Sequence, residues 1–571
     1  MKKTMKKLAG LALSGVLTLT ATLSPSSNWT AMTAQAASTP SRVAVHDPSI
    51  AVGTDGTYYV FGSHMATASS EDLINWTQIS TDYQNKTNNS VYGNITKNFA
   101  KPFSWAGEND MDCSGGHAIW APDVVYNEDY VNTDGSKGAY MMYFCTSSTA
   151  VRSVIGYAIS DKIQGPYTVV DTIVYSGFSK SDAYDSDGTK QSKINKNYTN
   201  TNIDELIADG TLKDGVNSKW FSGSSGFNNT LYPNAIDPNI FRDTEGRMWM
   251  SYGSWSGGIY ILELDPATGK AIYPGKSSTS SDGHMVDEYF GTKIAGGFRK
   301  SGEAPYILYD KESKYYYMYM SYEFLTQKSG YNMRLFRSKS PDGPYVDAAG
   351  NDAVLATSTT SHSNVGIKVM GNYDLPYIET AYMAEGHNSA LIDSKTGNRY
   401  LVYHTRFETR GEAHQVRVHQ QFMNAEGWPV TAVYENKGDV ISSTGYDTTE
   451  IVGQYHFIDH KTNNDGANIK SPATITLNKD GSISGDATGT WSQTANSYLA
   501  TFTIDKVKYS GVFFKQTVET SSKKVMTFTA IGTNNHTIWG SQKPLAIEST
   551  ASTLYVGGNT GKTAKLSISG V

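Results

Sequence analysis

Three acidic side chains stand one or two positions before a proline. They are Asp47 in His-Asp-Pro-Ser, Asp237 in Ala-Ile-Asp-Pro-Asn and Glu303 in Gly-Glu-Ala-Pro-Tyr. Proline favours an extended backbone in the residue before it and has no amide hydrogen to give to a strand ladder. We therefore expect extended acids at strand starts, with carboxyl groups that point into a cavity. Carboxyl groups crowded together split their pKa values, so this set could perform general acid–base chemistry.

The elements that would position these acids recur along the chain. Strand-like runs rich in Tyr, Val and Met are found at Tyr58–Phe61, Tyr140–Phe144, Met248–Tyr252, Tyr315–Tyr319 and Tyr400–His404. Their spacing is too wide for a simple sandwich and is typical of four-stranded blades joined by long loops. The sequence thus predicts an all-β fold, a five-bladed β-propeller, with a helical pattern only around 202–209.

Two similar segments support a repeat. Gly156–Ser160 leads into Gly165-Pro166-Tyr167, and Arg334–Ser338 leads into Gly343-Pro344-Tyr345. A single acid–proline motif is most often a surface turn. Three of them, each at the start of a different blade, favour one central cavity instead.

The pattern of the sequence changes after the predicted blades, the last of which should end near residues 428–429. We expect a signal peptide at 1–37, the propeller at 38–430, a linker at 431–450, a small all-β module at 451–548 and a tail at 549–571. The module is predicted as either a barrel or a sandwich. It could bind carbohydrate through Trp491 and Trp539, or it could support the propeller. The tail resembles the opening strands of a bacterial immunoglobulin-like repeat, or it is a frayed terminus.

The first residues have the pattern of an export signal. Four lysines in Met1–Lys7 precede a short apolar stretch, and Ala34-Gln35-Ala36 has the small-x-small pattern of a cleavage site. We expect a secreted, monomeric protein, extracellular or held at the cell surface. The net charge of -6, without a basic stripe, argues against nucleic acid, and no later segment is apolar enough for a membrane span. Pairing of Cys113 with Cys145 is left open.

Four motifs carry a resemblance to a known family. In chain order they are His-Asp-Pro-Ser at 46–49, Ala-Ile-Trp-Ala-Pro-Asp at 118–123, Asn-Ala-Ile-Asp-Pro at 234–238 and Gly-Glu-Ala-Pro-Tyr at 302–306. Over about residues 40–545 the chain resembles glycoside hydrolase family 43, most of all its secreted endo-α-1,5-L-arabinanases with an extra C-terminal β-domain. The resemblance implies hydrolysis of arabinan, a side chain of pectin, with inversion. It also implies Asp47 as general base, Glu303 as general acid and Asp237 as the residue that orients the acid and raises its pKa.

Two alternatives stay open. One is an exo-acting arabinofuranosidase or β-xylosidase of the same fold, because the insertions at 82–112 and 184–226 could build a blind pocket as well as an open groove. The other is a sugar-binding propeller without catalysis, although the presence of all three acids argues against it.

Other residues are candidates for binding. Trp120 lies between two turn motifs and is predicted to stack on a sugar at the cavity rim. Asn234, Ser254 and His387 are predicted to contact substrate.

The resemblance also implies a calcium ion in the central channel, held by His404 together with water molecules. Calcium prefers oxygen ligands, so only the resemblance supports this histidine. Glu385 could pass for the acid, but it lacks the Ala-Pro that follows Glu303.

Overall fold

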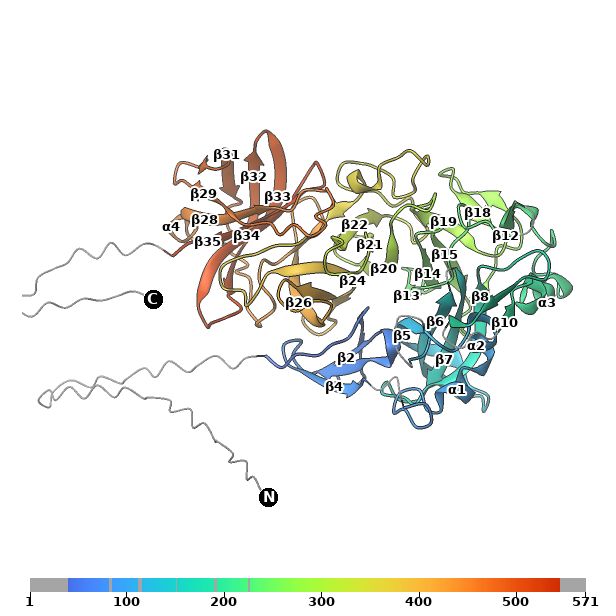
Figure 1. Cartoon of the computed structure of the whole chain (residues 1–571). Coiled ribbons are helices and arrows are strands. Elements are labelled where there is room, and N and C mark those ends of the chain that lie inside the picture. The colour runs from blue at the N-terminus through green and yellow to red at the C-terminus, as the bar shows by residue number, and fades with distance from the viewer. Residues whose placement is uncertain are drawn as a thin grey trace, which may run out of the picture. The chain divides into compact units, whose positions relative to one another are not determined.

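The computed structural model describes residues 40–81, 85–110, 116–149, 151–188, 193–223 and 226–544, which form strands and loops with few helices (Figure 1). The predicted signal peptide, Cys113 and the tail at 549–571 lie outside the described residues. Among the residues described, no helix has the length and apolarity needed to cross a bilayer.

Five antiparallel sheets follow one another along the chain. The first contains β1 (Ser49–Val52), β2 (Tyr58–Phe61), β3 (Thr67–Ser70) and β4 (Trp76–Ser80). The second contains β5 (Ile119–Val131), β6 (Lys137–Thr149), β7 (Arg152–Ser160) and β8 (Thr168–Tyr175). The third contains β13 (Asn239–Arg242), β14 (Met248–Ser254), β15 (Gly258–Leu264) and β19 (Gly291–Ala295), with β16 (Ala271–Ile272), β17 (Ser278–Thr279) and β18 (Met285–Asp287) added.

The last two sheets are simpler. The fourth contains β20 (Glu303–Asp310), β21 (Tyr315–Tyr322), β22 (Asn332–Ser338) and β23 (Ile367–Lys368). The fifth contains β24 (Tyr382–Ile392), β25 (Arg399–Phe407), β26 (His414–Met423) and β27 (Pro429–Thr431).

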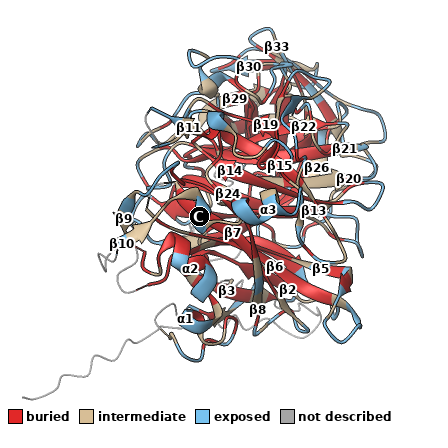
Figure 2. Cartoon of the chain, turned by 90° about the vertical axis from the view of Figure 1, so that its right-hand side faces the viewer, coloured by how far each residue is buried: buried red, intermediate tan, exposed pale blue. Residues whose placement is uncertain are grey.

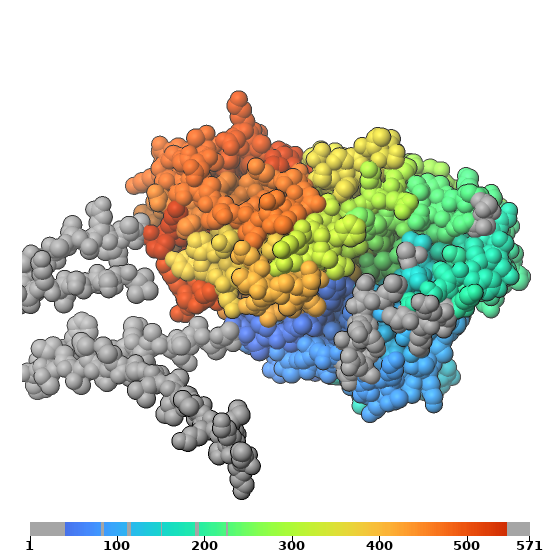
Figure 3. Space-filling model, in the orientation of Figure 1, coloured from blue at the N-terminus to red at the C-terminus, as the bar shows by residue number. Residues whose placement is uncertain are grey.

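The first strands of the five sheets form a closed ring. β1 contacts β5, β5 contacts β13, β13 contacts β20, β20 contacts β24, and β24 contacts β1. The blue first sheet accordingly lies beside the yellow-to-orange fifth sheet (Figures 1 and 3). This arrangement is propeller-like, and the prediction of an all-β, propeller-like body is confirmed.

The Tyr-rich runs of the sequence form the second strand of each sheet. β14 is buried at every position and β21 at every position but its first. Neighbouring sheets cover both faces of these strands, so their residues are apolar or aromatic nearly throughout rather than at alternate positions. Buried residues accordingly concentrate in the strands and exposed residues in the loops (Figure 2).

The insertions between sheets hold the helices. The predicted helical segment is α3 (Ile203–Ala208), while α1 (Ile95–Asn98) and α2 (Ala100–Ala106) were not predicted. The Asn94 side chain caps α1, and Phe99 and Phe103 pack into the core beside it, so contacts beyond local periodicity stabilise this region. Short 3-10 helices occur at Ser63–Met65, Tyr198–Asn200, Ser218–Trp220 and His362–Asn364, and small strands at β9 (Tyr184–Ser186), β10 (Lys193–Asn195), β11 (Phe221–Ser222) and β12 (Gly226–Phe227).

A closed eight-stranded barrel follows a short helix, α4 (Thr448–Ile451). Its strands are β28 (Gly453–Asp459), β29 (Ala473–Leu477), β30 (Ser482–Gly485), β31 (Gly489–Gln493), β32 (Leu499–Ile504), β33 (Val507–Thr517), β34 (Lys524–Gly532) and β35 (Thr537–Gln542). Of the two forms left open, the module is therefore a barrel.

Two tryptophans of this barrel are buried and cannot serve as surface platforms for sugar. Trp491 packs inside the barrel, and Trp539 packs in a cluster that also contains Tyr373 and Leu401 of the propeller-like body. A buried ion pair joins Lys368 to Asp465 at 2.7 Å across the same contact. The idea that these tryptophans bind carbohydrate is wrong, because both side chains fill hydrophobic cores. The contacts agree with a supporting role for the barrel.

Candidate active site

The first strands meet at a narrow central channel. Each sheet contributes part of its first strand, near the start in the first four sheets and in the middle of β24 in the fifth. The lining is Asp47-Pro48-Ser49, Ala121-Pro122-Asp123, Asp237-Pro238-Asn239, Ala304-Pro305-Tyr306 and His387-Asn388. The leading residue of each group has a positive φ, between 30° and 55°. The expected extended backbone of Asp47 and Asp237 is therefore wrong, since both have φ of 55°. The preference of a pre-proline residue is local and weak, and contacts around the ring override it. One such contact is the Asp47 N–H, which donates to His404 Nδ1 at 3.2 Å.

Polar side chains directly after the prolines of the channel join neighbouring sheets through hydrogen bonds. The buried Asp123 carboxylate accepts from Ser49 Oγ of the first sheet and, in the third, from Asn239 Nδ2 at 3.1 Å and the Ile240 N–H at 2.6 Å. Asn239 Oδ1 in turn accepts from the N–H of Ile307 in the fourth sheet at 2.7 Å. Bonds to a carboxylate are among the stronger hydrogen bonds. They fix the strands at the axis and hence the acids that precede them.

A cavity of about 360 Å³ adjoins this channel. Its lining includes all three predicted acids, together with Trp120, Asn234 and His387. Ser254 lies beside it and donates from Oγ to Glu303 Oε2 at 3.4 Å. The other lining residues are Asp110, Ser147, Ser148, Thr149, Val151, Ile236 and Leu325. Glu385 is not among them: it is fully buried, and burial raises its pKa to about 8.

Asp47 is surrounded by histidines. Its Oδ1 lies 2.8 Å from His46 Nδ1 and 2.9 Å from His387 Nδ1, while Ser63 Oγ donates to Oδ2. Burial acts to raise the pKa of Asp47, but the positive charges of His387 and then His46 outweigh it and hold that pKa well below its ordinary value. Burial likewise acts to lower the pKa of His387, but the nearby carboxylates, Asp47 foremost, raise it to about 9. Asp47 is thus ionised beside a protonated His387 at neutral pH.

The hydrogen-bond donors to Glu303 and Asp237 are neutral groups. Tyr331 donates its hydroxyl to Glu303 Oε1 at 2.7 Å, and the Ala304 N–H donates to Asp237 Oδ2 at 3.3 Å. Burial raises the pKa of Glu303, and the charge of Asp47 adds to it, while Tyr331 and His387 oppose the shift. Burial also raises the pKa of Asp237, and the charges of Glu303 and Asp47 add to that shift against His387. The carboxyl groups on this side of the cavity therefore keep a proton at higher pH, closer to neutral, than ordinary carboxyl groups do.

Together the two sides supply one ionised carboxylate and one protonated carboxyl group in one cavity. A general base must accept a proton at the operating pH, and a general acid must still carry one. The displacement of two pKa values in opposite directions is how one site provides both.

Two further residues complete the cavity wall. Trp120 is half-buried, and its Nε1 donates to the Ser147 carbonyl at 2.9 Å, which fixes the ring at the rim. Asn234 Oδ1 accepts from Ser153 Oγ at 2.7 Å and Ser176 Oγ at 3.2 Å. Its oxygen end is thus fixed, so the NH2 group is the end that can serve a ligand.

Sequence reasoning missed three residues that touch the acids. His46 stands in the His-Asp-Pro motif itself, so its place beside Asp47 had a visible signal. Ser63 and Tyr331 follow later strands in unremarkable segments, and only the fold brings them to Asp47 and Glu303.

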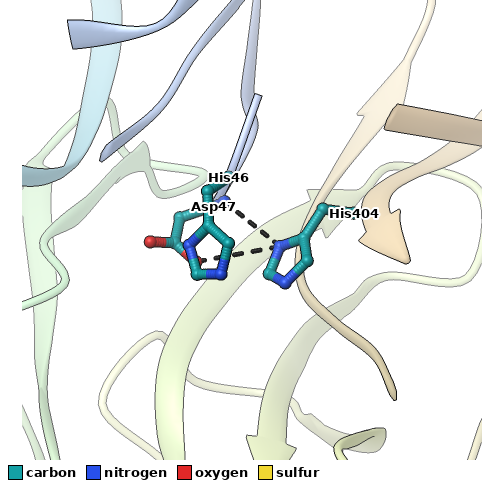
Figure 4. A group of neighbouring side chains, drawn as sticks. All are labelled: His46, Asp47 and His404. Carbon is teal, nitrogen blue, oxygen red and sulfur yellow. Dashed lines mark hydrogen bonds and ion pairs between the residues drawn. The ribbon is translucent and has the colours of Figure 1, made fainter. Parts of the chain in front are cut away.

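His46, Asp47 and His404 form a group whose nitrogen and oxygen atoms lie within 4.8 Å of one another (Figure 4). His404 Nδ1 accepts from the Asp47 N–H, and its Nε2 lies 3.3 Å from the guanidinium group of Arg406. Calcium takes six to eight oxygen ligands, whereas this group offers one carboxylate, which already serves two histidines and Ser63. As arranged, the group does not fit a calcium ion bound directly to His404, and the calcium prediction stays a prediction.

Comparisons with known proteins agree with this geometry. The model for glycosyl hydrolases family 43 matches residues 214–429, and one for a C-terminal lipocalin-like domain matches 433–540. The chain is 37% identical to the extracellular endo-α-(1→5)-L-arabinanase 2 of Bacillus subtilis, over 88% of this chain and 93% of the relative. It is 38% identical to the extracellular endo-α-(1→5)-L-arabinanase of Thermotoga petrophila, over 87% and 93%.

Solved structures show the same similarity. The crystal structure of endo-1,5-α-L-arabinanase from Thermotoga petrophila matches with a TM-score of 0.71 and 36% identity, over 89% of this chain and all of the other. A family 43 glycoside hydrolase from Bacillus licheniformis matches with a TM-score of 0.70 and 35% identity, over 88% and 99%. Similarity of this extent, over both the propeller-like body and the barrel, shows that the chain belongs to glycosyl hydrolase family 43.

Proposed function

We propose that this protein is a secreted endo-α-1,5-L-arabinanase, which hydrolyses internal linkages of arabinan with inversion at the anomeric carbon. One observation carries the catalytic part: three carboxyl groups line one cavity, and their pKa values are displaced in opposite directions. The similarity to extracellular endo-α-(1→5)-L-arabinanases supports the linkage and the extracellular location.

Each acid has a role that follows from its surroundings. Asp47, held ionised by His387 and His46, takes a proton from the water that attacks the anomeric carbon. Glu303 gives its proton to the oxygen of the departing chain. Asp237 tunes and orients Glu303: the two carboxyl groups share this side of the cavity, and the charge of Glu303 adds to the raised pKa of Asp237.

The remaining wall residues bind and orient the sugar. Trp120 stacks on a sugar ring at the rim, while Asn234 and His387 contact its hydroxyl groups. Ser254 orients the Glu303 carboxyl group through its hydrogen bond. These contacts hold the sugar between base and acid, which lowers the entropic cost of reaching the transition state.

We also infer that the five sheets are the blades of a five-bladed propeller, because the first strands close a ring of five contacts. Of the described residues, 40–430 then belong to the propeller and 451–544 to the barrel module, joined by the predicted linker.

Product analysis on linear, debranched arabinan tests the reaction. A ladder of arabino-oligosaccharides early in the digest is expected from endo cleavage. Free arabinose as the sole early product would replace the proposal with an exo enzyme, and binding without any product would replace it with a sugar-binding propeller. Proton NMR of the first products should show the β anomer, as inversion of an α linkage requires.

Two accessory predictions have direct tests. Chelation with EDTA followed by added calcium tests the ion: activity that falls and is restored supports calcium, and unchanged activity removes it. Expression with the full N-terminal segment tests export: a product in the medium that begins near Ser38 is expected.

A further inference from the structure

A loop at the edge of the cavity exposes apolar side chains. It joins β21 to β22, and in it Phe324 is 65% exposed and Leu325 is 36% exposed. Leu325 also lines the active-site cavity. Trp255 belongs to the turn between β14 and β15. The centroid of its ring lies 4.6 Å from the centroid of the Phe324 ring, and the two ring planes are inclined by 35°. We call Trp255, Phe324 and Leu325 the rim platform.

Buried polar contacts hold this loop on both sides of the exposed pair. Before it, the Glu323 N–H donates to Ser301 Oγ at 2.5 Å, and the Glu323 carboxylate lies 3.2 Å from His362 Nε2. After it, the buried Gln327 donates from Nε2 to the carbonyl groups of Phe407 and Glu408. The loop is therefore fixed, and it presents two large apolar side chains to solvent. A contiguous patch of exposed apolar side chains beside a cavity is typical of a binding surface.

The platform is tied to one side of the reaction centre. Trp255 follows Ser254, which donates to Glu303, and the loop is held by Ser301, two residues before Glu303. The side chains of the platform come from turns of the third and fourth sheets; the fifth sheet, which carries His387, holds the loop through the Phe407 carbonyl group but adds no side chain to the platform. A general acid protonates the oxygen of the leaving group, so the part of the substrate that departs lies on the acid's side.

We propose that the rim platform binds the leaving-group part of the arabinan chain, with furanose rings packed against Trp255 and Phe324 and against Leu325 at the cavity edge. This rests on the proposed function. It goes beyond it by assigning the platform to the sugar units beyond the cleaved bond. Aromatic faces suit this because a sugar ring has an apolar face of C–H groups, and stacking does not demand one fixed register along a polymer.

The test compares Phe324→Ala and Trp255→Ala with the unmodified enzyme on two substrates. One is linear arabinan. The other is a 4-nitrophenyl arabino-oligosaccharide, whose leaving group is nitrophenol and does not reach a site for further sugars. Each variant should raise KM for arabinan about tenfold, as expected for loss of an aromatic contact. The kcat/KM for the nitrophenyl substrate should stay unchanged, because acid and base are intact.

Controls separate the outcomes. Tyr126→Ala removes an aromatic side chain that is 52% exposed and does not line the cavity, and it should leave both substrates unaffected. Phe324→Tyr keeps the ring and should retain most of the affinity for arabinan. An unmodified enzyme that fails to cleave arabinan would remove the proposed function and this inference with it. An active enzyme whose Phe324→Ala and Trp255→Ala variants keep the parent KM, or lose the nitrophenyl substrate in equal measure, would overturn this inference alone.

Discussion

Both sides of the active-site cavity carry carboxyl groups, but the two sides shift the pKa values of these groups in opposite directions. Asp47 comes from the first sheet, and its pKa lies well below the ordinary value. Asp237 and Glu303 come from the third and fourth sheets, and their pKa values are raised. Burial acts upward on all three. Burial therefore does not decide which acid keeps its proton.

Neighbouring charge decides it. Histidines from the first and fifth sheets reach Asp47 within 3 Å, and His387 is protonated because carboxylates surround it. In the described part of the chain, the hydrogen-bond donors to Glu303 and Asp237 are neutral: a hydroxyl group of Tyr331, one of Ser254 and a backbone N–H. A cation within hydrogen-bonding distance favours the ionised form more than a neutral donor does. The difference assigns base and acid.

Replacing the base should have the largest effect. Asp47→Asn keeps the shape of the side chain but cannot accept the proton of the attacking water. We expect kcat to fall by about 10³-fold or more on both arabinan and a nitrophenyl arabino-oligosaccharide, measured in steady-state assays. A loss confined to arabinan would contradict the role of base.

Replacing the acid should lower kcat by a factor that depends on the leaving group. Glu303→Gln should lower kcat about 10³-fold on arabinan, whose leaving alcohol needs a proton. The loss on the nitrophenyl substrate should be much smaller, because nitrophenolate departs without one. Equal losses on both substrates would show that Glu303 does not protonate the leaving group.

Removing the positive charge beside the base should shift the pH profile. In His387→Gln the Asp47 carboxylate loses its principal cation, so the pKa of Asp47 should rise. A base is active when ionised, so the acidic limb of kcat/KM should move to higher pH. His284→Gln, which removes a histidine paired with Asp352 away from the cavity lining, is the matched control. An acidic limb that stays in place would contradict electrostatic control of Asp47.

The smallest effect is expected from Tyr331→Phe. The tyrosine hydroxyl group stabilises the ionised form of Glu303 and so lowers its pKa. Its removal should raise that pKa further, and an acid is active when protonated, so the basic limb of the profile should move to higher pH. A shift to lower pH would mean that the hydroxyl group acts on the cavity in another way.

Much of this arrangement was visible in the sequence. The Tyr-rich runs predict the second strand of each sheet, because strands covered on both faces need apolar residues nearly throughout. The acid–proline steps predict strand starts, and β1 and β13 do begin two residues after Asp47 and Asp237, while β20 begins at Glu303. These are local properties, which depend on neighbours in the chain.

The sequence by itself predicted the all-β class, the recurring sheets and three acids that share one cavity, because strand composition and the missing amide hydrogen of proline act over a few residues. Only the tertiary structure decided the left-handed backbone of Asp47 and Asp237, the burial of Trp491 and Trp539, and the contact of His387 with the base. His387 meets Asp47 because the fifth sheet closes the ring against the first. Contacts between residues so far apart in the chain leave no periodic signal, so they exist only once the ring has closed.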